Sequence, residues 1–129
     1  MQRYCFETSF IIDFLREKND AIEKYREIKA QKLETTSVVA WEILRGPKLY
    51  GRVKEYNEAI KFLERLNLLP FTLTSARIAS EIELDLKEKG RSVNLIDVLI
   101  AATAIENNSK LVTRDEGYEN IKGLEVVFY

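Results

Sequence analysis

Short apolar runs alternate along the chain with longer segments whose hydrophobic residues recur at helical spacing. This spacing predicts helices over residues 10–18, 21–30, 37–45, 52–66, 75–89 and 95–106. The short runs predict strands over residues 4–6, 33–37, 68–73, 110–113 and 124–128. Strands separated by helices are typical of an α/β fold with a mostly parallel sheet, in which chemistry gathers at the carboxyl ends of the strands.

No repeat, low-complexity segment or linker interrupts the sequence, which predicts one domain over residues 1–129. Hydrophobic residues make up 46% of the chain and charged residues 32%, which is a globular composition. No apolar run reaches the length of about 20 residues that a membrane helix needs. Glu7 and Asp13 come too early for the apolar part of a secretory signal, so we expect a cytoplasmic protein.

The residue types present limit the chemistry of any site. The 20 basic and 21 acidic residues give a net charge of −1, so RNA binding would need a local basic patch or metal ions. The sequence has no histidine and only one cysteine, Cys5, which excludes imidazole catalysis and a multi-cysteine zinc site. An enzyme built from this chain would rely on carboxylates and on water activated by a metal ion.

Asp97 is the only charged residue in the apolar segment 95–105. An unpaired carboxylate is costly to bury, so its presence in such a helix requires an explanation. One interpretation is an ordinary acid in the first helical turn, three residues after a capping Asn94. The other is a carboxylate that faces a polar pocket where a metal ion offsets its charge. Both interpretations stay open at this point.

Four further acids lie next to apolar residues or at the ends of predicted strands. Glu7 and Asp115 each follow a strand, where a loop acid and a metal ligand are equally reasonable. Glu42 interrupts an apolar helix, where a solvent-facing residue is the commoner case, and we expect Asp13 to be a surface acid. If such acids converged with Asp97 they would repel one another unless Mg²⁺ or Mn²⁺ lay between them.

Four segments in order resemble the motifs of PIN-domain ribonucleases, and especially the VapC-like toxins of toxin–antitoxin pairs. They are FETSFIID (6–13), TSVVAWEILRG (36–46), NLIDVLIAATA (94–104) and LVTRDEGY (111–118). The order and spacing extend the resemblance from Tyr4 to Val127. The sequence departs from the family pattern at Glu7, where Asp is usual, and at Tyr118, where Phe is usual.

This resemblance implies a three-layer α/β/α domain with a short, mostly parallel central sheet. It also implies a Mg²⁺- or Mn²⁺-dependent endoribonuclease that hydrolyses single-stranded RNA. A VapB-like antitoxin and a second copy of the chain, in a homodimer, would be its protein partners. Residues 46–51 would form part of an antitoxin-binding groove, after Gly46-Pro47 ends the preceding helix.

The family pattern also assigns roles to individual residues. One or two metal ions would be held by the carboxylates of Glu7, Glu42, Asp97 and Asp115. Hydrogen bonds to these carboxylates or to bound water would come from Thr8, Ser9 and Thr113. Phosphates of the RNA would be contacted by Arg114 and Arg45, although an ordinary solvated side chain is the commoner case for Arg45. We expect Trp41 to lie in the core rather than to stack on bases.

Two other functions fit parts of the same sequence. The first is a catalytically weakened PIN module that binds an antitoxin or RNA without efficient cleavage. Glu7 favours it, because the extra methylene of Glu lengthens the side chain by roughly 1.5 Å and displaces a bound ion. The second is a phosphorylated receiver domain, but the sequence around Glu7 offers no acid pair after the first strand, which counts against it.

Overall fold

A single parallel sheet forms the centre of the computed structural model, which describes residues 1–92 and 94–129. Its strands, in the order β3-β2-β1-β4-β5, are β1 (Arg3–Phe6), β2 (Lys32–Thr36), β3 (Asn67–Leu69), β4 (Lys110–Thr113) and β5 (Val126–Phe128). All four strand pairings are parallel. The predicted α/β class with a short parallel sheet is confirmed.

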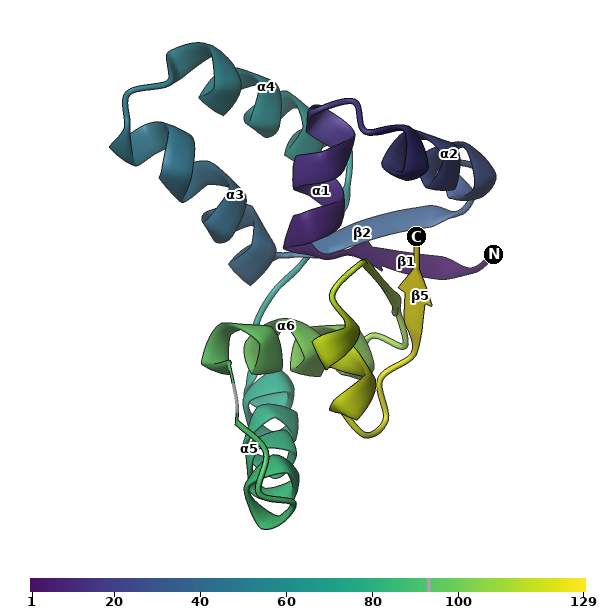
Figure 1. Cartoon of the computed structure of the whole chain (residues 1–129), viewed down its shortest axis with the longest axis vertical. Helices are drawn as coiled ribbons and strands as arrows, with labels where there is room; N and C mark the ends of the chain where they lie inside the picture. The colour runs from purple at the N-terminus through teal and green to yellow at the C-terminus, as the bar shows by residue number, and fades with distance from the viewer. Residues whose placement is uncertain (93) are drawn as a thin grey trace.

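Helices cover both faces of this sheet. One face carries α1 (Thr8–Leu15), α2 (Asn19–Ile28), α3 (Ser37–Leu49) and α4 (Val53–Glu64). The other face carries α5 (Leu73–Glu88) and α6 (Leu95–Glu106), as Figure 1 shows below the strands. The three layers predicted from the family resemblance are therefore present. None of the helices in the described residues has both the length and the apolarity needed to cross a membrane.

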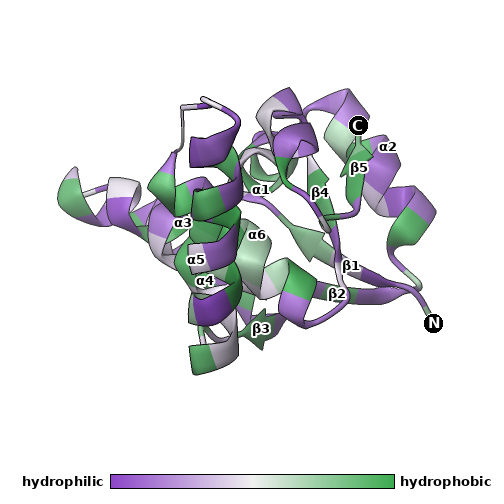
Figure 2. Cartoon of the chain, turned by 90° about the horizontal axis from the view of Figure 1, so that it is seen from below, coloured by the Kyte–Doolittle hydropathy of each residue, from purple (hydrophilic) through white to green (hydrophobic). Residues whose placement is uncertain are grey.

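The core lies between the sheet and the helices on its two faces. Cys5 and Phe6 of β1 and Leu111 and Val112 of β4 are fully buried, as expected of central parallel strands covered on both sides. Helix α6 is apolar nearly all the way round because it lies between the sheet and α5. The more peripheral α2 and α5 show alternating hydrophobic and hydrophilic segments in Figure 2, since one side of each faces solvent.

Helix α3 is longer than the sequence predicts. Gly46-Pro47 was expected to end it, yet the helix continues through Pro47 to Leu49. Pro47 removes one backbone donor, and only Lys48 and Leu49 of the helix follow it. The N–H groups of Tyr50 and Arg52 close that turn by donating to the carbonyls of Gly46 and Pro47, at 3.1 and 2.8 Å. The predicted stop at Gly46-Pro47 was therefore wrong.

The order of the strands creates a switch point between β1 and β4. From β1 the chain moves outward through β2 to β3, and it then returns to the opposite side of β1 as β4. Connections on opposite sides leave a crevice at the carboxyl ends of these two strands, the usual place for ligands in such sheets. Glu7 directly follows β1 and Asp115 lies just beyond β4, so both acids are at this crevice.

Candidate functional site

Glu7 is a buried carboxylate held by several donors at the end of β1. It caps the N-terminus of α1 and is only 6% exposed. Its Oε1 accepts hydrogen bonds from Ser9 N at 3.1 Å, Ser9 Oγ at 2.5 Å and Thr113 Oγ1 at 2.5 Å. The contacts expected of Ser9 and Thr113 are thus present, and they fix one oxygen of the Glu7 carboxylate.

Thr113 connects Glu7 to Asp115. While its hydroxyl donates to Glu7, the same oxygen accepts from Asp115 N at 3.0 Å. Asp115 is exposed, and its Oδ1 accepts from Gly117 N at 2.9 Å. This bond caps the short 3₁₀ helix η1 (Glu116–Asn120), so Asp115 has a local structural role in addition to any role as a ligand.

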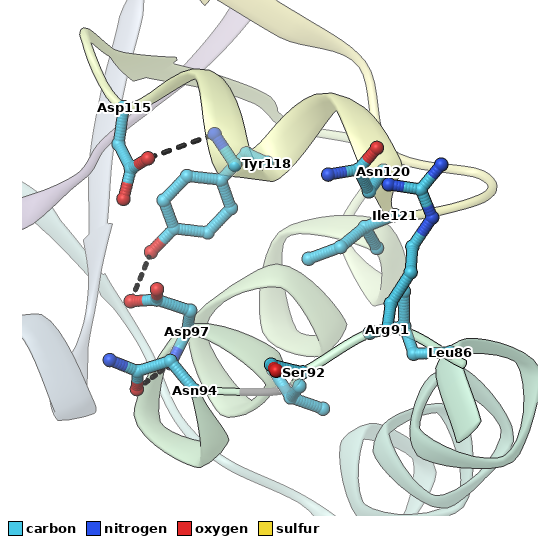
Figure 3. Close-up of a pocket in the computed structure, with 11 residues that line it drawn as sticks. Leu86, Arg91, Ser92, Asn94, Asp97, Asp115, Tyr118, Asn120 and Ile121 are labelled. Carbon is cyan, nitrogen blue, oxygen red and sulfur yellow. Dashed lines mark hydrogen bonds between the residues drawn. The ribbon is translucent and has the colours of Figure 1, made fainter. Parts of the chain in front are cut away.

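Asp97 is partly buried in the first turn of α6. Asn94 caps the helix, with Oδ1 accepting from Asp97 N at 3.3 Å. The hydroxyl of Tyr118 donates to Asp97 Oδ1 at 2.9 Å, and Figure 3 shows the Tyr118 ring extending from η1 toward the start of α6. Both interpretations from the sequence hold in part: Asp97 lies in a capped first turn, and it also faces a polar pocket.

Glu42 approaches from α3 and is fixed by α1. Thr8 Oγ1 donates to Glu42 Oε1 at 2.5 Å, which is the contact expected of Thr8. Glu42 is partly buried rather than fully solvated. The alternative of an ordinary surface Glu therefore does not describe its surroundings.

The electrostatics show that these acids act on one another. Burial raises the pKa of the Glu7 carboxyl above its ordinary value, against the lowering effect of its Ser9 and Thr113 donors, and the charge of Asp97 raises it further. Burial likewise raises the pKa of Asp97 despite the Tyr118 hydrogen bond. The charges of Asp115 and Glu42 add to that increase. Glu7, Glu42 and Asp115 therefore each lie within electrostatic reach of Asp97.

These four acids form no ion pair with a Lys or Arg side chain in the part of the chain that the structure describes. Within the described residues, no Lys or Arg nitrogen lies within 4.0 Å of a carboxylate oxygen of Glu7, Glu42, Asp97 or Asp115. A donor set of carboxylate oxygens with excess negative charge suits a hard divalent cation. No three such side chains in residues 1–92 and 94–129 already form a metal-binding group, so cation binding would need side-chain movement.

A cavity of about 650 Å³ opens beside two of the acids. Asp97 and Asp115 lie at one end of it, and Arg91 and Asn120 lie at the other, with Tyr118 between them (Figure 3). This volume falls in the range of pockets that hold small ligands or parts of larger ones.

A buried acid that was expected elsewhere pairs with Arg114 beside the site. Asp13 was expected at the surface, but it is 1% exposed, so that prediction was wrong. It accepts from Arg114 Nη2 at 2.7 Å and from Tyr129 Oη at 2.6 Å, and these donors stabilise it in the interior. Arg114, a predicted RNA contact, thus has one nitrogen bound to Asp13, while about half of its side chain stays exposed.

The aromatic side chain of Trp41 also departs from its prediction. It was expected in the core, but it is 52% exposed. The guanidinium of Arg45 lies 5.3 Å from the centre of its ring, so the two residues form a cation–π pair on the outer surface of α3.

The family assignment follows from a match along most of the chain. The sequence model of the PIN domain matches residues 4–124. The chain belongs to the PIN domain family. Ribonuclease VapC2 of Rickettsia felis is 27% identical to this PIN domain over 116 residues, covering 87% of the chain and 86% of the relative. The resemblance indicated by the four sequence motifs is confirmed.

Solved structures have the same fold. VapBC2 from Rickettsia felis, bound to a DNA fragment from its promoter, matches this PIN domain with a TM-score of 0.88 and 22% identity, covering 98% of both chains. DNA-bound VapBC from Salmonella typhimurium gives a TM-score of 0.87 and 21% identity, covering 99% of this chain and 98% of its own. At these identities the structures establish the fold alone.

Proposed function

We propose that residues 1–129 form one PIN domain that acts as a metal-dependent endoribonuclease on single-stranded RNA, in the role of a VapC-like toxin. The observation that carries this proposal is the group of four carboxylates at the switch point without a paired cation. The relative named as a ribonuclease, VapC2, supports the reaction class. Glu7, Glu42, Asp97 and Asp115 would hold Mg²⁺ or Mn²⁺.

The hydrogen bonds of these carboxylates fit that role. Each acid has one oxygen fixed by a donor from the chain, as described above. Among the described residues, the second oxygen of each accepts no side-chain hydrogen bond and stays available to a cation. Ser9 and Thr113 orient Glu7, and Thr8 orients Glu42. A divalent cation, when bound, supplies the Lewis acid that activates water and stabilises charge on the phosphodiester.

Arg114 is the best-placed basic residue for contacts to RNA. Its backbone lies at the carboxyl end of β4, directly before Asp115. Asp13 holds one guanidinium nitrogen, which leaves other N–H groups of the half-exposed side chain free to face a phosphate. The guanidinium of Arg45 lies over the ring of Trp41, so we assign Arg45 a smaller contribution to RNA binding than Arg114.

We also propose a VapB-like antitoxin as a partner. The similar structures from Rickettsia felis and Salmonella typhimurium are VapBC assemblies. A cavity of about 550 Å³ between α1, α3 and α4 includes Ile12, Ile43, Tyr50 and the acid Glu42 among its lining residues. An antitoxin segment in this groove would reach the proposed active site at Glu42. A homodimer is proposed on the family resemblance alone.

The catalytically weakened module is the less favoured alternative. Its basis is the longer side chain of Glu7, which was expected to displace the bound ion. In the structure the Glu7 carboxylate is not loose, because three hydrogen bonds from Ser9 and Thr113 fix Oε1. A fixed carboxylate favours a site in which Glu7 is accommodated.

Cleavage of a single-stranded RNA pool by the purified protein, with and without Mn²⁺ or Mg²⁺, tests the proposed function. Asp97→Asn is the matched control, since Asn keeps the shape of Asp and removes its charge. We expect metal-dependent cleavage by the wild type and a loss of at least about a hundredfold in the variant, because Asn removes the negative charge that would bind the cation, and even the loss of a group that only hydrogen-bonds to a metal-binding side chain costs about 10- to 100-fold.

The pattern of results separates the two candidate functions. Equal cleavage by the wild type and Asp97→Asn would contradict the site assignment. Metal binding without cleavage by the wild type would favour the weakened module, and Glu7→Asp would then be expected to restore activity. No metal binding at all would contradict the endoribonuclease proposal.

A further inference from the structure

We propose that Tyr118 is a positioning residue of the metal site: its buried hydroxyl fixes one oxygen of Asp97 and leaves the other for the cation. This inference rests on the proposed function and extends it to a residue outside the set of carboxylates. Tyr118 is also one of the two positions at which the sequence departs from the family motifs, which have Phe there. The departure adds a single oxygen atom to the side chain.

The added oxygen has one defined contact. Tyr118 is 1% exposed, so its hydroxyl cannot turn to solvent for a partner. It donates to Asp97 Oδ1 at 2.9 Å, and among the described residues Oδ2 accepts no side-chain hydrogen bond. The direction of this bond follows from the two groups, because a phenol hydroxyl has a hydrogen to donate and an ionised carboxylate only accepts.

The position of Tyr118 is set by Asp115. Asp115 Oδ1 caps the 3₁₀ helix that carries Tyr118, through the bond from Gly117 N. The fit is close, because a Cβ atom at Gly117 would lie 3.0 Å from Asp115 Oδ1. A continuous series of contacts thus runs from Thr113 through Asp115 and η1 to Tyr118 and Asp97. These contacts fix the position of Asp97 relative to Asp115, although the two acids lie on different elements.

The hydroxyl matters because, among the described residues, it is the one side-chain donor to the Asp97 carboxylate. A Phe ring at the same place would fill the space but would leave Oδ1 without this donor and free to rotate. Groups that hydrogen-bond to metal-binding side chains typically change metal affinity by 10- to 100-fold when they are removed.

The chain provides a matched control for removal of a phenol hydroxyl. Tyr129 Oη donates to Asp13 Oδ2 at 2.6 Å, so it too holds a buried carboxylate. Asp13 is outside the group of four acids and is paired with Arg114. Tyr129→Phe therefore removes the same atom from a contact to a buried carboxylate that is not one of the four acids.

Isothermal titration of Mn²⁺ into the full-length protein, without RNA, tests the proposal. We expect Tyr118→Phe to bind Mn²⁺ about tenfold more weakly than the wild type and Tyr129→Phe to bind it with unchanged affinity. Circular dichroism and thermal melting of both metal-free variants verify that each is folded at the titration temperature. A role of Tyr118 in folding alone would lower its melting temperature without changing the Kd for Mn²⁺.

The outcomes are distinct. Weaker binding in Tyr118→Phe alone supports the proposal. Unchanged Mn²⁺ affinity in Tyr118→Phe overturns the role of Tyr118 and leaves the endoribonuclease proposal intact. Equal weakening in both Phe variants would show a nonspecific effect and has the same consequence. No Mn²⁺ binding by the wild type would contradict the proposed function itself, and the role of Tyr118 with it.

Discussion

Glu34 in β2 and Glu7, which directly follows the neighbouring strand β1, are both buried carboxylates, and their surroundings are opposite in kind. Glu34, in the middle of β2, is fully buried and accepts from Arg3 Nε at 2.8 Å and Arg3 Nη2 at 2.9 Å. Asn67 Nδ2 adds a third bond at 2.6 Å. Burial alone would raise the pKa of Glu34, but the donors and the charge of Arg3 bring it below its ordinary value. Burial raises the pKa of Glu7 instead, and no such cation lowers it.

The difference separates a structural carboxylate from a functional one. A two-pronged Arg contact neutralises Glu34 and satisfies both its oxygens, so this group needs nothing from outside the chain. Glu7 has one oxygen satisfied by neutral donors and faces the charge of Asp97. Folding alone does not favour an uncompensated carboxylate in the interior. Its presence at a strand end is the reason we propose that a cation from solution completes the site.

The comparison between Glu34 and Glu7 predicts its largest effect on the free energy of unfolding when each residue is replaced by Gln. Glu34→Gln removes the charge that pairs with Arg3, and we expect it to destabilise the protein by about 2 kcal/mol, the usual size of a hydrogen bond to a charged group. Glu7→Gln removes a charge that has no counter-ion and whose ionisation is disfavoured by burial, so we expect the free energy of unfolding to be equal to or above that of the wild type. Urea unfolding of the metal-free proteins at pH 7 measures both values.

A loss of stability in Glu7→Gln as large as that in Glu34→Gln would break the comparison. It would show that the Glu7 charge stabilises the fold without a metal ion. RNA cleavage by the two variants provides a second readout, since only Glu7→Gln is expected to lose it.

A smaller effect is expected in the pH dependence of stability. Because the pKa of Glu34 is lower in the folded than in the unfolded protein, its ionised form stabilises the fold at pH values above the unfolded pKa of about 4.3. This stabilisation is lost as the pH falls through the folded pKa of Glu34. The raised pKa values of Glu7 and Asp97 have the opposite effect on the pH dependence of stability. Their ionisation lowers the stability of the metal-free protein as pH rises from about 4 through their folded pKa values.

We therefore expect the melting temperature of the metal-free protein to be highest at mildly acidic pH. Saturating Mg²⁺ should remove the decline toward neutral pH, because it binds the ionised carboxylates of the folded state. Thermal melts across pH with EDTA and with Mg²⁺ measure this. The same profile in both conditions would contradict a cation site at Glu7 and Asp97.

The periodicity of the sequence was enough to predict an α/β fold with a mostly parallel sheet and the carboxyl ends of β1, β4 and β5, whereas the three layers were implied by the family resemblance and the strand predicted over 68–73 ends at Leu69. The strand over 110–113 and the helix over 95–106 were predicted with the bounds observed for β4 and α6. The four acids could be named because each interrupts an apolar segment or follows a strand. Periodicity gave no means of predicting that α3 continues past Gly46-Pro47, since cap bonds from later residues close its last turn.

Contacts between distant segments account for the rest. Asp13 is buried because Arg114 and Tyr129 reach it from the other end of the chain, a pairing that no local pattern reveals. Glu34 was overlooked for the same reason, since its partner Arg3 lies on a different strand. Tyr118 was visible in the sequence only as a departure from the family pattern. Its contact with Asp97 depends on how η1 packs against α6.

Anomalous X-ray diffraction from crystals grown with Mn²⁺ tests most directly whether the uncompensated carboxylates form a metal site. We predict a strong anomalous peak among Glu7, Glu42, Asp97 and Asp115, and none beside Glu34, which Arg3 already neutralises. Crystals with saturating Mn²⁺ that show no peak among the four acids, or a peak only elsewhere, would contradict the assignment of this group as the metal-binding active site.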